Sequence, residues 1–305
     1  MRSLTELSTA ERINFLICNR IPRRYLTLLV ARLSSIENPL IMKSCMAIWQ
    51  LFADDLRLHE AVKSQFSSLH DCFTRELKPG FRPIDARSDV IVSPCDAVIG
   101  EHGPVQGMQA FQAKGFPYSL AELFGDDQAA EQYATGSFIS LRLKSSMYHR
   151  FHAPCDGHVK QVRYISGDTW NVNPVALKVV EKLFCRNERA VIRYYPAAAE
   201  DSKPPVHEAP ALTLVAVAAI LVACIRIHGI PQPLHLRYQG PNLFDCSTQH
   251  QKGDEMGWFE HGSTLLLFAP PGYRFCAGVH RGAIIRMGQA IMQRSAQPSV
   301  ILQSS

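Results

Sequence analysis

The sequence predicts an α+β protein in which an N-terminal helical, membrane-facing cap precedes a β-rich body. Apolar residues recur at helical spacing up to Leu77, and the pattern stops at Lys78-Pro79-Gly80. Beyond this break, short runs typical of β-strands alternate with turn residues over residues 80–290. We therefore expect a helical region at 1–77, a β-rich domain at 78–293 and a loose tail at 294–305.

Three helices are expected in the N-terminal region, separated by residues that stop or start helices. Ser8 and Glu11 have the spacing of a capping box, which indicates a helix start. Pro22 stops this helix and can open the next one, because proline fits the first turn of a helix. Pro39 precedes Leu40–Phe52, which is apolar on nearly every side. A helix with this pattern is either buried or inserted into an interface.

Composition restricts the partners of the chain. Its 305 residues are 47% hydrophobic and carry a formal net charge of +5, which indicates a globular core and is too small an excess to predict nucleic-acid binding. Residues 1–35 contain six arginines and two glutamates, an excess that suits an anionic membrane, although a solvated helix face is the simpler explanation of charge alone. No apolar run reaches the ~20 residues of a membrane span, so any membrane contact is expected to be peripheral.

Nine cysteines without a CxxC pair indicate reduced thiols, and the polar first 12 residues predict no signal peptide.

The β-rich domain contains six runs with strand character and two segments without it. Ala197–Pro210 is rich in proline and predicts a surface loop, and residues 229–252 are polar and turn-rich with little periodicity. The six runs are Val90–Val92, Phe138–Leu143, His158–Ile165, Ala190–Tyr195, Thr213–Ile227 and Ser263–Phe268.

The triplet Gly262-Ser263-Thr264 has a specific chemical use. Glycine leaves the carbonyl before the serine unshielded and permits strained backbone torsions. The serine hydroxyl can attack this carbonyl, which moves the acyl group from nitrogen to oxygen. Elimination from the ester leaves dehydroalanine, and hydrolysis converts dehydroalanine to a pyruvoyl group and ammonia. Alone, the triplet is weak support for this chemistry, because most such triplets are turns.

A hydroxyl is a poor nucleophile, so this chemistry needs a base and a carboxylate that orients the base. The segment Tyr148–Gly157 supplies His149 and His152, and Asp96 follows a proline turn after an apolar run. Spacing leaves two alternatives for the histidines, which are a metal pair on a helical turn and ordinary surface residues.

Seven segments resemble, in the same order, the phosphatidylserine decarboxylase family. Together they extend over roughly residues 10–275, and seven matches in order do not arise by chance. They are Phe73–Ile84, Ser93–Asp96, Lys114-Gly115 with Tyr118–Leu120, Tyr148–Pro154, Gly167-Asp168 with Val172-Asn173, Leu183–Arg189, and Gly253–Thr264.

The resemblance implies a self-processing, pyruvoyl-dependent decarboxylase that converts phosphatidylserine to phosphatidylethanolamine. Self-cleavage would occur between Gly262 and Ser263, and Ser263 would become the covalent pyruvoyl cofactor. His152 would be the base for cleavage and Asp96 would orient His152. His149 would assist decarboxylation through substrate contact or proton delivery. The pyruvoyl group would draw off electrons as carbon dioxide leaves, and no metal is expected.

The resemblance also implies partners. The substrate would be phosphatidylserine in an anionic membrane, with the enzyme peripheral on the cytoplasmic face of the cell membrane. The two cleavage products would stay associated, and a homodimer is compatible with this interpretation. The expected membrane contact comprises the apolar faces around Leu16, Ile17, Leu26 and Leu29, the helix Leu40–Phe52, and Arg20, Arg23 and Arg24 against lipid phosphates.

Three features depart from the family pattern. Ala97, Ala218 and Ala223 stand where the family commonly has glycine, and the loop Ala197–Pro210 is longer than usual. The added methyl groups would narrow a pocket or shift the backbone, which bears on the substrate more than on self-cleavage. Two alternatives follow, a family member that decarboxylates another amino acid or lipid head group, and a non-enzymatic lipid-binding relative. A serine hydrolase is disfavoured because Ser263 lies in no Gly-x-Ser-x-Gly elbow.

Overall fold

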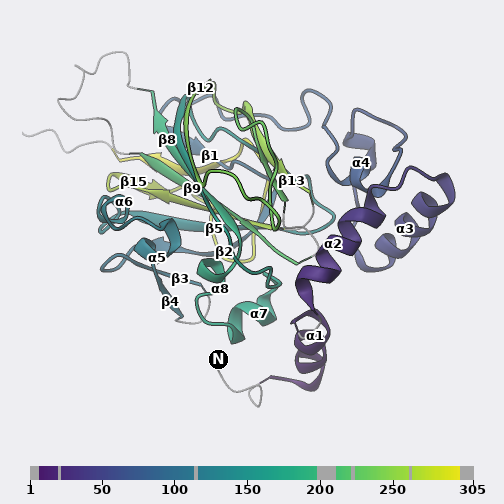
Figure 1. Cartoon of the computed structure of the whole chain (residues 1–305). Coiled ribbons are helices and arrows are strands. Elements are labelled where there is room, and N and C mark those ends of the chain that lie inside the picture. Colours follow the sequence, from purple (N-terminus) through teal and green to yellow (C-terminus); the bar gives the residue numbers. More distant parts are fainter. Residues whose placement is uncertain are drawn as a thin grey trace, which may run out of the picture.

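The chain is an α+β protein, as predicted, with a group of N-terminal helices beside a β-rich body (Figure 1). The computed structural model describes residues 7–19, 22–112, 116–197, 211–220, 224–260 and 263–295. No helix in these ranges combines the length and the apolar character that crossing a membrane requires.

The N-terminal helices begin where the capping residue Ser8 and the prolines at 22 and 39 predict. They are α1 (Thr9–Asn19), α2 (Arg23–Ser34) and α3 (Pro39–Phe52). The capping box before α1 is formed, since the Ser8 N–H donates to Glu11 Oε2 at 3.0 Å and the Glu11 N–H donates to Ser8 Oγ at 3.2 Å. Pro22 precedes α2, and Asn38 accepts hydrogen bonds from the first turn of α3.

Two short helices and a buried arginine connect these helices to the body. The 3₁₀ helix η2 (Leu58–Glu60) and the helix α4 (Leu69–Phe73) follow α3. Arg75 is buried after α4 and donates hydrogen bonds to the carbonyl oxygens of Cys72, Leu56 and Ser146. Its guanidinium therefore ties the end of the helical region to the loop that follows strand β5 (Ser137–Leu143) of the body.

The largest described sheet has eight antiparallel strands with the central strand β14 between β5 and β9. Alternate residues along β14 belong to two buried apolar clusters, one on each face of the sheet. In spatial order the strands are β12 (Leu243–His250), β7 (Gly157–Ile165), β8 (Arg189–Pro196), β9 (Leu212–Ala218), β14 (Ser263–Ala269), β5 (Ser137–Leu143), β2 (Ala97–Pro104) and β16 (Ile284–Ile285).

Each face of this sheet is covered by a different layer. On one face lie the short helices α5 (Leu120–Phe124), α6 (Asp127–Glu131), α7 (Pro174–Val179) and α8 (Leu183–Arg186). On the other lies a four-stranded sheet of β11 (Leu234–His235), β10 (Cys224–Ile227), β13 (Glu255–Phe259) and β6 (Arg150–His152). A three-stranded sheet, β1 (Val90–Val92), β17 (Ala290–Arg294) and β15 (Tyr273–Phe275), and the hairpin β3 (Gln109–Phe111) with β4 (Pro117–Ser119) complete the body.

The strand predictions are confirmed for the central strands and wrong at the edge of the sheet. The run Thr213–Ile227 contains two strands, β9 and β10, rather than one. The absence of strand periodicity in residues 229–252 is misleading, because β12 pairs with β7 over Leu243–His250. This edge strand alternates between exposed and half-buried residues, so it carries little apolar signal. Most of the predicted loop Ala197–Pro210 and tail 294–305 lies outside the described residues.

Candidate active site

A cavity of about 630 Å³ lies between the N-terminal helices and the body. Apolar side chains of α2, α3 and α4, among them Ile48, Trp49 and Phe73, form one wall. The opposite wall comes from the ends of strands β5 and β14 and from the loop that contains Asn171, and it includes Ser263. The cavity is therefore apolar on the helical side and polar on the side of the body.

Ser263 is the first residue of the central strand β14. Its Cα partners are Leu143 of β5 and Ala218 of β9, so the backbone is held from both sides. The side chain is fully buried, and its hydroxyl has no hydrogen-bond partner among the described residues. Burial of a hydroxyl without a partner costs free energy, so such a group indicates a function other than stability. Gly262, the predicted partner in self-cleavage, lies outside the described residues.

His152 is buried on β6 with a partner at each ring nitrogen. Nδ1 lies 2.8 Å from the carbonyl oxygen of Gly253, and Nε2 lies 2.9 Å from the hydroxyl of Tyr148. Because a carbonyl only accepts, we assign the proton to Nδ1, which leaves Nε2 to accept from Tyr148. Burial lowers the pKa of His152, although the bond to Gly253 opposes this effect. His152 is therefore a neutral imidazole whose basic nitrogen faces Tyr148.

His149 is fully buried just before β6. Its Nδ1 lies 2.7 Å from the carbonyl oxygen of Met147, and its ring centroid lies 4.0 Å from that of Phe73. Since Phe73 lines the cavity, one aromatic ring links His149 to the cavity wall. Both histidines are buried and His152 lies on a strand, so surface histidines and a metal pair on a helical turn are excluded.

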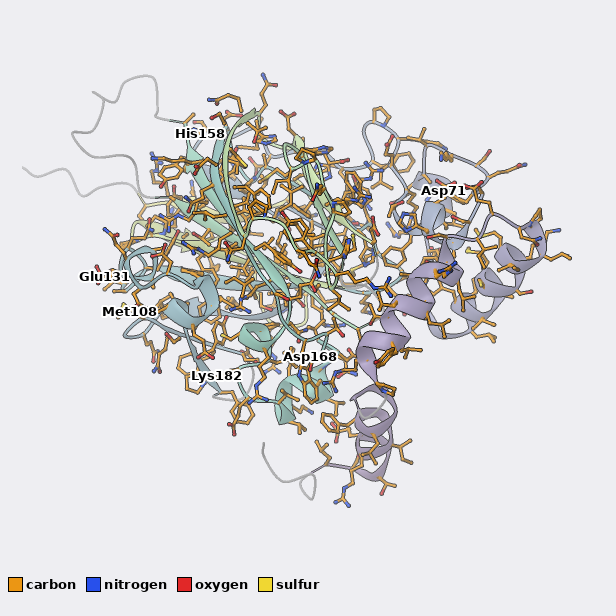
Figure 2. All side chains as sticks on the ribbon, in the orientation of Figure 1. Asp71, Met108, Glu131, His158, Asp168 and Lys182 are labelled. Atoms are coloured by element: carbon orange, nitrogen blue, oxygen red, sulfur yellow. The ribbon has the colours of Figure 1, made fainter. Side chains whose placement is uncertain are left out.

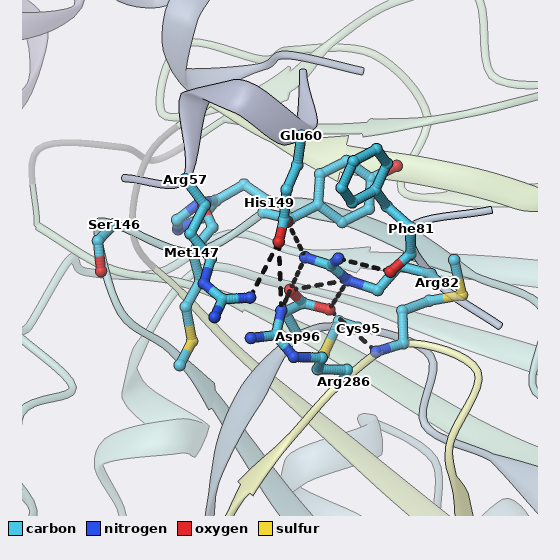
Figure 3. A network of polar contacts seen from close by, with 12 residues as sticks. Arg57, Glu60, Phe81, Arg82, Cys95, Asp96, Ser146, Met147, His149 and Arg286 are labelled. Carbon is cyan, nitrogen blue, oxygen red and sulfur yellow. Dashed lines mark hydrogen bonds and ion pairs between the residues drawn. The ribbon is translucent and has the colours of Figure 1, made fainter. Parts of the chain in front are cut away.

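Asp96 belongs to a buried network of charges around Arg82 (Figure 3). The Arg82 guanidinium donates to the Asp96 carboxylate from Nε at 2.8 Å and Nη2 at 2.5 Å, and to Glu60 at 2.8 Å. The Met287 N–H donates to Asp96 at 3.0 Å, and Arg286 lies 3.8 Å from it. Burial alone would raise the pKa of Glu60, but the bond and charge of Arg82 lower it overall, so Glu60 stays ionised.

The expected direct contact between Asp96 and His152 is not present among the described residues. Both ring nitrogens of His152 have other partners, and the Asp96 carboxylate accepts from the fork of Arg82. The bidentate, charge-assisted pair is the stronger interaction for a carboxylate, which is the physical reason for this arrangement. Asp96 instead borders a second cavity of about 350 Å³ that Tyr148 also lines. The hydroxyl of Tyr148 connects this second cavity to His152.

A family model described as phosphatidylserine decarboxylase matches residues 69–293, which include Asp96, both histidines and Ser263 but not Glu60 or the cavity wall from α2 and α3. The chain belongs to the phosphatidylserine decarboxylase family. A phosphatidylserine decarboxylase proenzyme of Shewanella putrefaciens is 33% identical over 292 residues, which cover 92% of this chain and 97% of the relative. A proenzyme of the same name from Vibrio cholerae is 35% identical over 280 residues, which cover 88% and 94% of the two chains.

Three residues of this phosphatidylserine decarboxylase site were not singled out from the sequence. Tyr148 and Arg82 lie within the segments that carry the family resemblance, and this position could have marked them as candidate site residues. Glu60 carried no signal, because only the fold places it against Arg82.

The structure corrects one predicted membrane contact. Arg23 donates from Nε and Nη2 to the Asp168 carboxylate, and its guanidinium lies 3.7 Å from the ring centroid of Trp170. Figure 2 shows Asp168 on the side of the body where α1 and α2 lie. Arg23 therefore fastens α2 to the decarboxylase body through an ion pair and a cation–π contact. Arg20 and the side chain of Arg24 lie outside the described residues.

Proposed function

We propose that this chain is a proenzyme that cleaves itself between Gly262 and Ser263 and then decarboxylates phosphatidylserine to phosphatidylethanolamine. Membership of the family makes it a decarboxylase. The observation that carries the proposal is that Ser263 is a lining residue of the cavity and that its buried hydroxyl has no described partner. Residue 263 can therefore present a reactive group to a ligand in that cavity, which fits a pyruvoyl group formed from the serine.

In self-cleavage, Ser263 attacks the preceding carbonyl and His152 takes the hydroxyl proton. A buried, neutral imidazole is suited to this task, because its Nε2 lone pair is available at neutral pH. Tyr148 occupies that nitrogen in the structure, so Nε2 must exchange the Tyr148 hydroxyl for Ser263 when it acts. The negative charge of Asp96 then favours the imidazolium that forms, without a direct hydrogen bond.

In decarboxylation, the chain's own residues bind the head group, exclude water and supply a proton. A pyruvoyl group at residue 263 supplies the conjugated carbonyl that accepts the electrons left by carbon dioxide. The apolar wall of Ile48, Trp49 and Phe73 keeps water from the reacting carboxylate, whose charge disappears as carbon dioxide leaves. His149, packed against Phe73, is the proposed donor of the proton that replaces carbon dioxide on the substrate carbon.

The position of β14 supports a stable association of the two cleavage products. Cleavage before Ser263 makes this residue the first of a strand that pairs with β5 on one side and β9 on the other. Every residue of the strand from Leu265 to Ala269 is fully buried. Separation would break both ladders and expose this apolar strand, so the small product should remain in the sheet.

The same helices that form the apolar wall of the cavity provide the proposed membrane contact. Large apolar side chains on α2 and α3 are strongly exposed, with Tyr25, Leu40 and Leu51 at 76–77% and Ile48 at 59%. Soluble proteins rarely expose so many large apolar residues together. Ile48 both lines the cavity and faces solvent, so the cavity adjoins this surface. We place the enzyme peripherally on the cytoplasmic face, where it can reach head groups without extracting acyl chains at ~0.8 kcal/mol per CH₂.

The test is turnover by the purified, full-length chain on liposomes that contain phosphatidylserine. We expect phosphatidylethanolamine and carbon dioxide in equal amounts, and neither product from Ser263→Ala. A folded, wild-type preparation that converts none of the lipid would overturn the proposal.

A second candidate rests on Ala218, the β9 residue opposite Ser263. Its methyl group lies beside the reacting residue, which motivates decarboxylation of another amino acid or lipid head group. Turnover of a panel of free amino acids and other serine lipids distinguishes the candidates. The first candidate requires phosphatidylserine to have the highest kcat/KM in that panel.

A further inference from the structure

Arg142 lies on the polar wall of the cavity, next to the reacting residue in the sheet. On β5 it pairs with Thr264 of β14, and the following residue, Leu143, pairs with Ser263. Arg142 and Ser263 both line the cavity of about 630 Å³. Because side chains alternate along a strand, Arg142 and Ser263 point to opposite faces of the sheet, and the cavity at the ends of the strands is where a ligand can contact both.

No residue in the described part of the chain balances the charge of Arg142. The side chain is half-buried, and burial lowers its pKa. No described carboxylate or carbonyl forms an ion pair or a hydrogen bond with it, whereas Lys144, two residues later, pairs with Asp54 at 2.8 Å. The buried Arg189 provides a second contrast, because its guanidinium donates to four backbone carbonyl oxygens.

The residue opposite Arg142 is also unsatisfied. The Thr264 hydroxyl is buried and has no hydrogen-bond partner in the described parts of the chain. An unpaired cation and an unpaired hydroxyl side by side are costly when buried, because both lose hydration. Arg142 lines the cavity whereas Thr264 does not, so an anion with several acceptor oxygens in the cavity would satisfy the guanidinium.

We propose that Arg142 binds the phosphodiester of the lipid head group and is a specificity-determining residue of this cavity. The inference rests on the proposed function and adds the group that recognises the substrate. In a serine phospholipid, phosphorus lies four bonds from the amine, a reach of about 5 Å. Arg142 and Ser263 both line the cavity, so one ligand of this length can contact both residues there.

The phosphodiester, rather than the carboxylate, is the anion that suits this position. An arginine paired with the carboxylate would stabilise the ground state and oppose the departure of carbon dioxide. The phosphodiester keeps its charge throughout the reaction, so Arg142 can bind substrate, transition state and product equally. Uniform binding of this kind lowers KM and leaves kcat nearly unchanged.

The experiment compares wild type, Arg142→Gln and Arg142→Lys with short-chain phosphatidylserine. Arg142→Gln should raise KM about tenfold to a hundredfold, as expected for loss of charge-assisted hydrogen bonds, with kcat within about threefold. Arg142→Lys should be intermediate, because lysine keeps the charge and loses the fork. Arg237→Gln, which removes an exposed charge outside the cavity, should leave both constants unchanged. Self-cleavage of the Arg142 variants should proceed normally, which also shows that they fold.

Product inhibition separates the two anions of the substrate. Short-chain phosphatidylethanolamine keeps the phosphodiester and lacks the carboxylate, so its inhibition constant should rise with KM in Arg142→Gln. An unchanged inhibition constant with a raised KM would assign Arg142 to the carboxylate and overturn the proposal. Equal KM values for wild type and both variants would also overturn it. If wild type itself converts no phosphatidylserine, the proposed function fails instead, so the two failures are distinguishable.

Discussion

Replacement of Asp96 by asparagine tests the role of the buried charge network. In the structure, the Asp96 carboxylate accepts hydrogen bonds from Nε and Nη2 of Arg82 and from the Met287 N–H. An asparagine side chain at this position would keep one acceptor oxygen. Its NH₂ group, however, would face the N–H donors of Arg82 or Met287 and could not accept from them. The substitution therefore removes a charge and creates a conflict in hydrogen bonding at the same place.

The expected loss of unfolding free energy depends on the ion pair that Arg82 keeps with Glu60. Breaking a buried ion pair by removing one partner destabilises a protein by about 3–5 kcal/mol. Glu60 still binds Arg82 at 2.8 Å after the change, so we expect the lower end, about 3 kcal/mol. For a domain of this size, that loss of unfolding free energy lowers Tm by about 6–12 °C.

The assay is thermal unfolding of Asp96→Asn in a Ser263→Ala background, so that both chains compared are uncleaved. The matched control is Asp85→Asn, because Asp85 forms a similar two-bond pair with Arg87 at the exposed surface, with 55% of the Arg87 side chain accessible. Solvent weakens that pair, so Tm should change little. A fall in Tm of less than about 2 °C for Asp96→Asn would refute the assignment of Asp96 to a stabilising network.

The remaining predictions concern the histidines, pH and the membrane. His152→Ala should slow self-cleavage most, whereas His149→Ala should reduce turnover more than it reduces self-cleavage. Gel bands measure cleavage and product assays measure turnover. If both variants lose cleavage equally, the two histidines share one role. Because burial lowers the pKa of His152, cleavage should lose less of its rate at pH 6 than a histidine base with the ordinary pKa of ~6.5 would lose. Tyr148→Phe removes the donor to Nε2, which raises the pKa of His152 and shifts the rate profile to higher pH; an unchanged profile would contradict this link. Replacing the exposed Tyr25 and Leu29 with aspartate should weaken binding to anionic liposomes in a sedimentation assay and leave self-cleavage intact. If the variant binds liposomes as tightly as wild type, the membrane contact lies elsewhere.

Local patterns in the sequence predict the helix boundaries and the central strands. The Ser8–Glu11 capping box and the prolines at 22 and 39 act within one helical turn, so neighbouring residues contain the information. Strand β14 is buried on both faces and therefore appears as an apolar run. The edge strand β12 is paired through its backbone and exposes alternate side chains, and helices of four to six residues such as α8 are too short to show a period.

The residues proposed for the site are recognisable from motifs, but their partners are not. Asp96 accepts from Arg82, 14 residues away, and from Met287, 191 residues away, and no local pattern predicts either bond. The same limit explains Arg23, whose basic segment suggested a membrane contact and whose carboxylate partner lies 145 residues away. Long-range pairing depends on the assembled fold, which also brings Arg142 to the cavity of Ser263.

Intact mass under denaturing conditions shows whether Ser263 is converted in place to a pyruvoyl group. Self-cleavage at Gly262-Ser263 should give two chains, residues 1–262 and residues 263–305, with the small chain lighter than its unmodified sequence and resistant to Edman degradation. The mass difference corresponds to loss of ammonia, because a ketoacyl group replaces the first amine. Ser263→Ala should give one full-length chain. A single full-length mass from folded wild-type protein, or a small chain with a free serine amine, would contradict the account.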